Sequence, residues 1–115
     1  MSQPANPGKS QAAMRLIAQT TFYNRGDQER LIQFIADAYA PELLEQQPPI
    51  AKAAAFAQLR HILGKVRVKR WIVMNEHDIV ARMEAENGTR FVVELKCMDD
   101  YPHKIIYYMQ HPSSS

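Results

Sequence analysis

The chain has 115 residues, of which 46% are hydrophobic and 23% are charged, and its formal net charge is +2. These values are typical of one globular domain and give no support for a nucleic-acid-binding surface. The single cysteine, Cys97, excludes an internal disulfide, and no apolar run approaches the ~20 residues needed to span a bilayer. We therefore expect a soluble cytoplasmic protein without a secretory signal, a nucleic-acid partner or a membrane partner.

Composition divides the chain into three parts. Residues 1–8 are polar and rich in proline and glycine, and we expect them to form a flexible arm. Residues 9–112 are expected to form a single domain, and residues 113–115 a flexible tail. The basic run at residues 65–70 is interrupted by valines, so its pattern is that of a strand rather than a phosphate-binding patch.

Capping residues and apolar spacing predict three helices in the first half of the chain. The first begins after Ser10 and ends near residues 23–24, with Gly26 as its stop and Asp27 as the next N-cap. The second ends before Pro41, and residues 42–47 add a possible turn. The third runs from Pro49 to residue 63. Apolar residues lie on two opposite sides of this third helix, which predicts that it packs between two other elements. The residues of these stripes are Ala13, Leu16, Ile17 and Thr20; Leu31, Phe34, Ile35, Ala38 and Tyr39; Ala55, Phe56, Leu59, Ile62 and Leu63; and the opposite row is Ile50, Ala54, Ala57 and His61.

After Gly64 the apolar period changes to two, which predicts four strands at residues 65–75, 78–86, 89–98 and 103–111. In the second and third strands one row of each is apolar and must face the helices. These rows are Ile79, Ala81, Met83 and Ala85, and Phe91, Val93, Leu95 and Cys97. A two-residue Asn-Gly loop would pair Glu84 with Phe91, whereas a three-residue loop at residues 86–88 pairs Met83 with Phe91. The second choice puts both rows on one face, so we expect it, with Gly88 in a left-handed conformation.

The faces of the first and last strands are less well determined by the sequence. A four-residue loop at residues 75–78 turns Val66, Val68, Arg70, Ile72 and Met74 toward the helices, whereas a three-residue loop would turn Trp71 and Val73 inward. We favour the first because its row is more apolar. In the last strand we expect Ile105, Tyr107 and Met109 to face inward and Lys104, Ile106 and Tyr108 to face outward.

Helices followed by a four-strand meander, together with three short motifs, resemble the nuclear-transport-factor-2-like superfamily. The motifs are Phe22-Tyr23-Asn24-Arg25-Gly26-Asp27, Tyr39-Ala40-Pro41-Glu42-Leu43-Leu44 and Pro102-His103-Lys104-Ile105. The last two are similar to a small domain fused to serine hydrolases of the β-lactamase-related kind, but no such hydrolase sequence is present here. The resemblance spans residues 14–112. It implies an α+β, cystatin-like fold in which a curved sheet and helices form a cone with an apolar pocket, commonly in a dimer. The superfamily includes ketosteroid isomerase and the SnoaL-like polyketide cyclases, besides proteins that only bind.

Isomerases and cyclases of this superfamily need an acid or a base inside the cone, within hydrogen-bond reach of the substrate. The inward rows of the second and third strands contain no Asp, Glu or His, so the expected base is missing there. The pocket candidates are Tyr23, Tyr39, Arg70, Met83, Cys97 and Tyr107. Spacing of the histidines predicts no metal site, and no cofactor-binding motif is found, so we expect no cofactor.

Two functions follow as hypotheses. The first is a binding domain that holds a small apolar or anionic ligand, or a partner protein, in or on the cone. The alternative is an isomerase, cyclase or dehydratase whose base comes from His61, Asp37 or Asp99. A carboxylate or histidine lining a cavity of several hundred cubic ångströms would favour the enzyme. A filled cone would remove both the enzyme and the small-ligand hypothesis and leave a structural or partner-binding role.

The outward face of the predicted sheet is too apolar to be left in water, which indicates a homodimer through this face. Charges of both signs can pair across a two-fold axis, and the aromatic residues would anchor the contact. The expected interface residues are Trp71, Arg82, Glu84, Glu94, Lys96 and Tyr108. A monomer covered by the N-terminal arm is the alternative.

Overall fold

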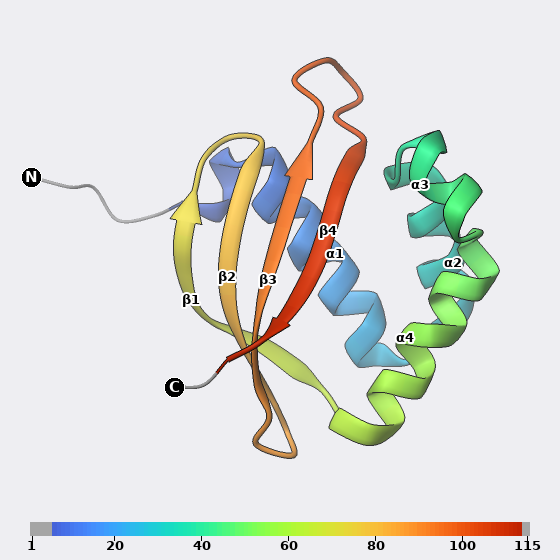
Figure 1. Ribbon diagram of the computed structural model, residues 1–115, viewed down its shortest axis with the longest axis vertical. Coiled ribbons are helices and arrows are strands. Elements are labelled where there is room, and N and C mark those ends of the chain that lie inside the picture. Colours follow the sequence, from blue (N-terminus) through green and yellow to red (C-terminus); the bar gives the residue numbers. More distant parts are fainter. Residues whose placement is uncertain (1–5, 114–115) are drawn as a thin grey trace, which may run out of the picture.

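Helices occupy the first half of the chain and strands the second, in an α+β arrangement (Figure 1). The computed structural model describes residues 6–113, so the outer parts of the expected arm and tail, residues 1–5 and 114–115, lie outside the described residues. A short 3-10 helix, η1 (Pro7–Lys9), precedes α1 (Gln11–Arg25), α2 (Gln28–Ala38), α3 (Pro41–Gln46) and α4 (Pro49–Leu63). The strands are β1 (Val66–Met74), β2 (Asp78–Ala85), β3 (Arg90–Cys97) and β4 (Ile105–Pro112).

The helix boundaries follow from the capping residues. Ser10 Oγ accepts a hydrogen bond from the Ala13 amide, and Asp27 Oδ1 accepts one from the Arg30 amide. Gly26, at φ 65°, ends α1 in the left-handed conformation that glycine adopts most readily. The predicted starts and stops of α1 and α2 are confirmed, and the possible turn after Pro41 is a helix of its own, α3.

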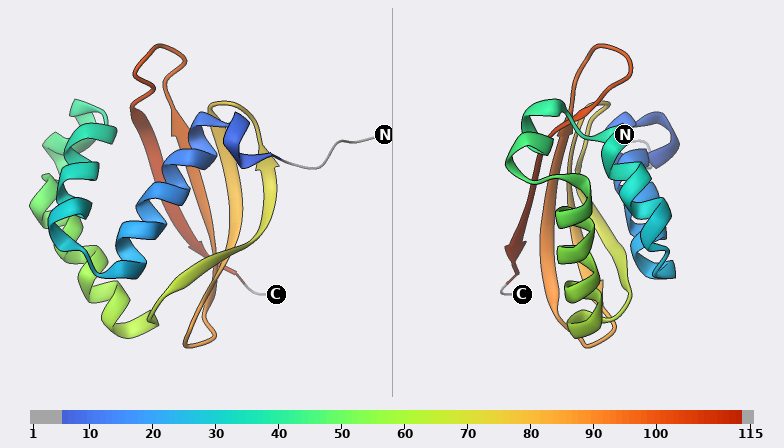
Figure 2. Two further views of the ribbon diagram at one scale, coloured as in Figure 1. Left: turned by 180° about the vertical axis from the view of Figure 1, so that it is seen from behind. Right: turned by 90° about the vertical axis from the view of Figure 1, so that its right-hand side faces the viewer.

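The strands form an antiparallel meander in the order β1-β2-β3-β4, and α1 lies across one face of it (Figures 1 and 2). Helix α2 packs against α1 and α4, and α3 contacts β4. In both figures α2 and α4 stand beside the β4 edge, while no helix of the described chain covers the opposite face of the sheet. None of the helices within residues 6–113 is long and apolar enough to cross a membrane.

The two central strands match the predicted register. Met83 lies opposite Phe91 and Ala81 opposite Val93, as the three-residue loop requires. Gly88 has φ 90°, which confirms its left-handed conformation. Both expected inward rows are buried, and the row of β3 packs against α1. The core therefore lies between α1 and the centre of the sheet.

The first strand contains two irregularities, and they overturn part of its predicted facing. Val66 pairs with Ala85 and Met74 with Ile79, as a four-residue loop at residues 75–78 requires. Between these ends β1 has two more residues than the facing part of β2, and they are accommodated as two bulges. Trp71 consequently pairs with Ala81 and packs on the core, so its expected outward position is wrong.

The same bulges correct the positions of two other residues. Arg70 pairs with Arg82 on the outer face, and Ile72 is 47% exposed. Both were expected to face the helices, and that expectation is wrong. A bulge shifts the alternation by one residue, so the residues after the first bulge point to the face opposite to the predicted one. The second bulge shifts the alternation again, and the residues after it point to the predicted face.

The last strand has one bulge, and nothing restores its facing. Ile105 pairs with Cys97 as an inward residue, but the next pair is Lys96 with Tyr107, so Ile106 is the extra residue. Beyond it, Tyr108 pairs with Leu95 and turns inward, whereas Tyr107 and Met109 turn outward. The predicted facing of these three residues is therefore wrong.

Several helical side chains are also more exposed than their periodicity predicts. Ile17 is 42% exposed, and Phe34 and Leu59 are only half-buried. The opposite row of α4 is exposed rather than sandwiched, with Ile50 at 71%, and Ile62 of its main stripe is at 67%. The prediction failed because α4 stands at the side of the sheet and contacts the rest of the domain along one face only.

Polar groups of the helical part are joined to the starts of both edge strands. The Asn24 side-chain amide donates to the Val66 carbonyl oxygen at 2.8 Å, and its Oδ1 accepts from the Val66 amide at 2.8 Å. The Ala40 amide donates to the Ile105 carbonyl oxygen at 2.8 Å, beside a parallel bridge between Tyr39 and Ile105. Residues of all three motifs quoted above therefore have structural roles.

Candidate functional site

The space between α1 and the sheet is almost completely filled by side chains. Its cavity has a volume of about 20 Å³, which is room for about one water molecule. The residues around it come from α1, α4 and all four strands, and include Leu16, Gln19, Tyr23, Phe56, Val66, Met83, Phe91 and Tyr108. A drug-sized ligand does not fit in this cavity as it stands.

A small polar network lies in this interior. Gln19 is 2% exposed, and its Oε1 accepts a hydrogen bond from the Tyr39 hydroxyl at 2.5 Å. Tyr108 Oη accepts one from Gln110 Nε2 at 2.9 Å. Burial raises the pKa of Tyr39 well above its ordinary value and raises that of Tyr108 to about 12. Both phenols therefore stay neutral near pH 7 and serve as hydrogen-bonding groups.

Lys52 of α4 is the cation nearest to this network. Its Nζ lies 4.9 Å from the ring centre of Tyr39, 5.4 Å from that of Tyr108 and 5.6 Å from that of Phe56. These distances permit cation–π attraction. Burial lowers the pKa of the Lys52 amine. The three rings and the lysine stem close the space between α4 and β4, which helps to explain why the interior is full.

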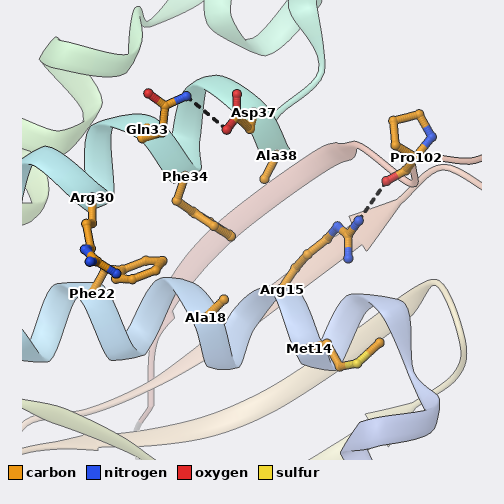
Figure 3. Close-up of a pocket in the computed structure, with 10 residues that line it drawn as sticks. All are labelled: Met14, Arg15, Ala18, Phe22, Arg30, Gln33, Phe34, Asp37, Ala38 and Pro102. Atoms are coloured by element: carbon orange, nitrogen blue, oxygen red, sulfur yellow. Dashed lines mark hydrogen bonds between the residues drawn. The ribbon is translucent and has the colours of Figure 1, made fainter.

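An open groove of about 620 Å³ lies between α1 and α2 (Figure 3). Phe22 and Ala18 rise from α1 and face Phe34 and Ala38 of α2 across it. Met14 and Pro102 lie at the end nearest the β3–β4 loop. Phe22 and Phe34 have ring centres 6.0 Å apart. The groove combines apolar walls with a few polar groups, as small-molecule sites commonly do.

Four polar side chains line this groove: Arg15, Arg30, Gln33 and Asp37. Arg15 donates from Nη2 to the Pro102 carbonyl oxygen at 2.7 Å and from Nη1 to Gln11 Oε1 at 3.2 Å. The Asp37 carboxylate accepts from Gln33 Nε2 at 3.0 Å. Arg30 forms an exposed ion pair with Asp27 at 3.4 Å.

The structure does not bring the predicted pocket residues together in one site. Tyr23 and Met83 line the small interior cavity, where Tyr23 donates to the Gly64 carbonyl oxygen at 2.9 Å. Tyr39 belongs to the polar network beside this cavity, and Cys97 is buried at the C-terminal end of β3. Burial raises the pKa of the Cys97 thiol.

The other predicted site residues are also dispersed. Arg70 and Tyr107 lie on the outer face of the sheet, away from the cavity and the groove. Of the suggested bases, His61 is exposed, Asp99 lies 3.5 Å from His77 in an exposed loop, and Asp37 lines the groove.

The expected interface residues are divided between the two faces of the sheet. Arg82, Glu84, Glu94 and Lys96 lie on the outer face, whereas Trp71 and Tyr108 pack toward the core. Glu84 already has partners in its own chain, because Arg67 lies 2.9 Å away, Arg90 3.4 Å and Lys69 3.8 Å. The hydrogen bond from Arg67 is the main cause of the lowered Glu84 pKa. Glu94 pairs with His111 at 2.5 Å, and the Lys96 amine lies 5.7 Å from the Tyr107 ring centre.

Sequence reasoning missed Gln19, Lys52 and the groove. Counted from Ala12, the buried residues Leu16, Gln19 and Tyr23 lie at i+4, i+7 and i+11. The buried position of Gln19 could therefore have been inferred from this helical spacing. Lys52 lies one helical turn before Phe56, which makes them neighbours. The groove was missed because Phe34 and Ala38 were both assigned to the core.

Among residues 6–113 no group of His, Cys, Asp and Glu side chains could hold a metal ion. Comparisons of the chain with protein-family models, curated proteins and solved structures find no match.

Proposed function

We propose that this protein is a binding domain that takes a small apolar ligand in the groove between α1 and α2. The groove itself carries the proposal: its volume of about 620 Å³ lies within the range of small-molecule sites, and aromatic and alanine side chains form its walls. The filled interior removes a ligand inside the cone, so the proposal is confined to the groove on the outside of the helical layer.

A neutral fluorescent probe, N-phenyl-1-naphthylamine, tests this proposal. We expect its fluorescence to rise on binding to the wild-type protein. Ala18 lines the groove and is only half-buried, so Ala18→Leu should narrow the groove without disturbing the core. Ala57→Leu on the exposed side of α4 is the matched control. Probe binding that Ala18→Leu leaves unchanged would contradict the proposal.

We also propose that the domain forms a homodimer through the outer face of the sheet. No described helix covers this face, and Tyr107, Val73 at 37% exposure and Met109 at 43% exposure lie on it. Tyr107 takes the place of Trp71 and Tyr108 as the aromatic anchor. Light scattering at micromolar concentration should give a dimer mass. Val80 pairs with Val73 and Glu94 on the outer face, so Val80→Glu should lower this mass. A monomeric wild-type protein would end this proposal.

Membership of the nuclear-transport-factor-2-like superfamily is part of the same proposal. The order of helices before a four-strand meander supports it, as do the structural roles of Asn24 and Ala40 within two of the quoted motifs. The chain would then be a member whose cone is filled by side chains. An experimental structure in which the sheet does not curve around α1 would argue against it.

The enzyme hypothesis has one observation in its favour, because Asp37 is a carboxylate in the groove. Asp37→Asn separates the two functions. A binding domain should keep its affinity for the neutral probe in this variant. An enzyme that uses Asp37 as a base would lose turnover of its hydrophobic substrate and retain binding.

A further inference from the structure

We propose that the ligand of the α1–α2 groove is an amphiphilic carboxylate of medium chain length, with its carboxylate at Arg15 and its apolar chain between Phe34 and Ala18. This inference rests on the proposed function and adds the chemistry of the ligand. It depends on the charge of the groove, on the bonding of Arg15 and on the length of the apolar walls.

Arg15 is a half-buried cation without a carboxylate partner. Within residues 6–113 no Asp or Glu lies at ion-pairing distance from its guanidinium, which donates hydrogen bonds to neutral oxygens of Gln11 and Pro102. Its Nε is buried and has no hydrogen-bond partner. A partly buried guanidinium is stabilised by an anion, and its planar donors suit a carboxylate. The structure therefore has an unpaired positive group at one end of an apolar groove (Figure 3).

The other charges around the groove also favour an anion. Arg30 adds a second cation, and its partner Asp27 is engaged as the N-cap of α2. The single carboxylate in the groove wall, Asp37, accepts a hydrogen bond from Gln33, and the Lys104 amine binds the Asp37 carbonyl oxygen. Two cations and one anion line the groove itself, which gives a formal charge of +1.

The length of the apolar walls sets the size of the ligand. Arg15 and Phe22 are seven residues apart on α1, which corresponds to about 10 Å along the helix axis. Ala18 lies between them, with Phe34 facing it from α2 (Figure 3). An extended alkyl chain advances about 1.3 Å per carbon, so a chain of about eight carbons covers this length. Octanoate is therefore the natural probe.

Calorimetric titration with octanoate and with octanol, which share the same chain, separates the carboxylate from the apolar contact. We expect octanoate to bind about tenfold more tightly to the wild-type protein, since a hydrogen bond to a charged group contributes that much. Arg15→Gln should bring octanoate to the affinity of octanol and leave octanol unchanged. Arg15→Lys should keep part of the preference. Arg25→Gln, on the same helix but outside the groove, should change nothing.

Each outcome is decisive for one of the two proposals. Equal affinity of the wild type for octanoate and octanol would overturn the carboxylate inference and leave the binding function standing. A preference for octanoate that survives in Arg15→Gln would place the carboxylate elsewhere and also overturn the inference. If neither probe binds to the folded protein, or if Ala18→Leu leaves octanol binding unchanged, the proposed groove function itself is wrong. Octanol binding in Arg15→Gln shows that this variant keeps its groove.

Discussion

The central strands β2 and β3 and the edge strands β1 and β4 were assigned by the same alternation rule, with opposite results. In the centre both inward rows are where the pattern places them, down to Met83 opposite Phe91. At the edges, bulges turn Trp71 and Tyr108 inward and Arg70 and Tyr107 outward. A central strand is held in register by neighbours on both sides, whereas an edge strand can accommodate an extra residue. Alternation is therefore a safer guide to facing in the middle of a sheet.

The largest expected effect is the loss of a side chain from the centre. Leu95 is fully buried, so Leu95→Ala should lower the free energy of unfolding by ~2–5 kcal/mol. Met109→Ala on the outer face of β4 is the control and should cost about 0.5 kcal/mol or less in the monomeric domain. Urea unfolding monitored by circular dichroism measures both. A similar loss in the two variants would contradict the assigned difference between centre and edge.

Two neighbouring residues of β1 test its bulges. Trp71→Ala removes a ring that packs on the core and should cost about 2 kcal/mol. Ile72→Ala removes an exposed side chain and should change stability by about 0.5 kcal/mol or less. If Ile72→Ala were the more costly substitution, β1 would have the facing that its sequence pattern predicted.

Substitutions at Gly88 in the β2–β3 loop should change the stability of the domain through backbone conformation alone. A Cβ atom at Gly88 would meet no atom within 4 Å, so Gly88→Val should cost about 1 kcal/mol through its φ of 90° rather than through a clash. Gly88→Asn should cost less because asparagine tolerates the left-handed region. Thermal unfolding compares the two, and an unchanged melting temperature in Gly88→Val would contradict the loop assignment.

Tyr107 and Tyr108 are adjacent in β4 but face opposite sides of the sheet. Their main difference is expected in the stability of the domain at high pH. In the unfolded chain Tyr108 ionises near pH 10, whereas in the folded state its pKa is raised to about 12. Its contribution to stability is therefore complete below pH 10 and is lost as the pH rises toward 12.

Phenylalanine substitutions isolate this contribution. Tyr108→Phe should reduce the fall in unfolding free energy above pH 10 and cost about 1 kcal/mol at neutral pH, because Gln110 loses an acceptor. Tyr107→Phe, on the outer face, is the matched control. Denaturant unfolding between neutral pH and the alkaline range measures both. Equal slopes in the two variants would show that Tyr108 does not face the interior.

The fold was predictable where local signals agree. Ser10, Gly26, Asp27 and Pro49 mark helix boundaries by their own chemistry, and the conflict of Glu84 with Phe91 determined the central loop. The bulges of β1 and β4 were not predictable, because the alternation of the sequence does not show where a strand contains an extra residue. The exposed row of α4 was misassigned because periodicity shows which residues share a face, and not whether another element covers that face.

The candidate site was less predictable than the fold. The groove depends on how α1 and α2 pack, and the apolar stripe of α2 gave no indication that Phe34 and Ala38 would lie at its margin. The family resemblance implied an apolar pocket, and the sequence did not decide whether it is open or filled. In the structure Tyr108 turns inward after the bulge at Ile106, while Phe56 and Lys52 approach from α4. One extra residue in β4 thus helps to fill the cavity that the fold was expected to enclose.

The contacts at the starts of the two edge strands also bear on aggregation. An exposed strand edge offers unpaired backbone groups to which another chain can add a strand. Here the Asn24 side chain occupies both backbone groups of Val66, and Ala40 occupies the carbonyl of Ile105. The bulges interrupt the remaining backbone groups of both edges. These contacts make both edges less open to strand addition at the points where they occur.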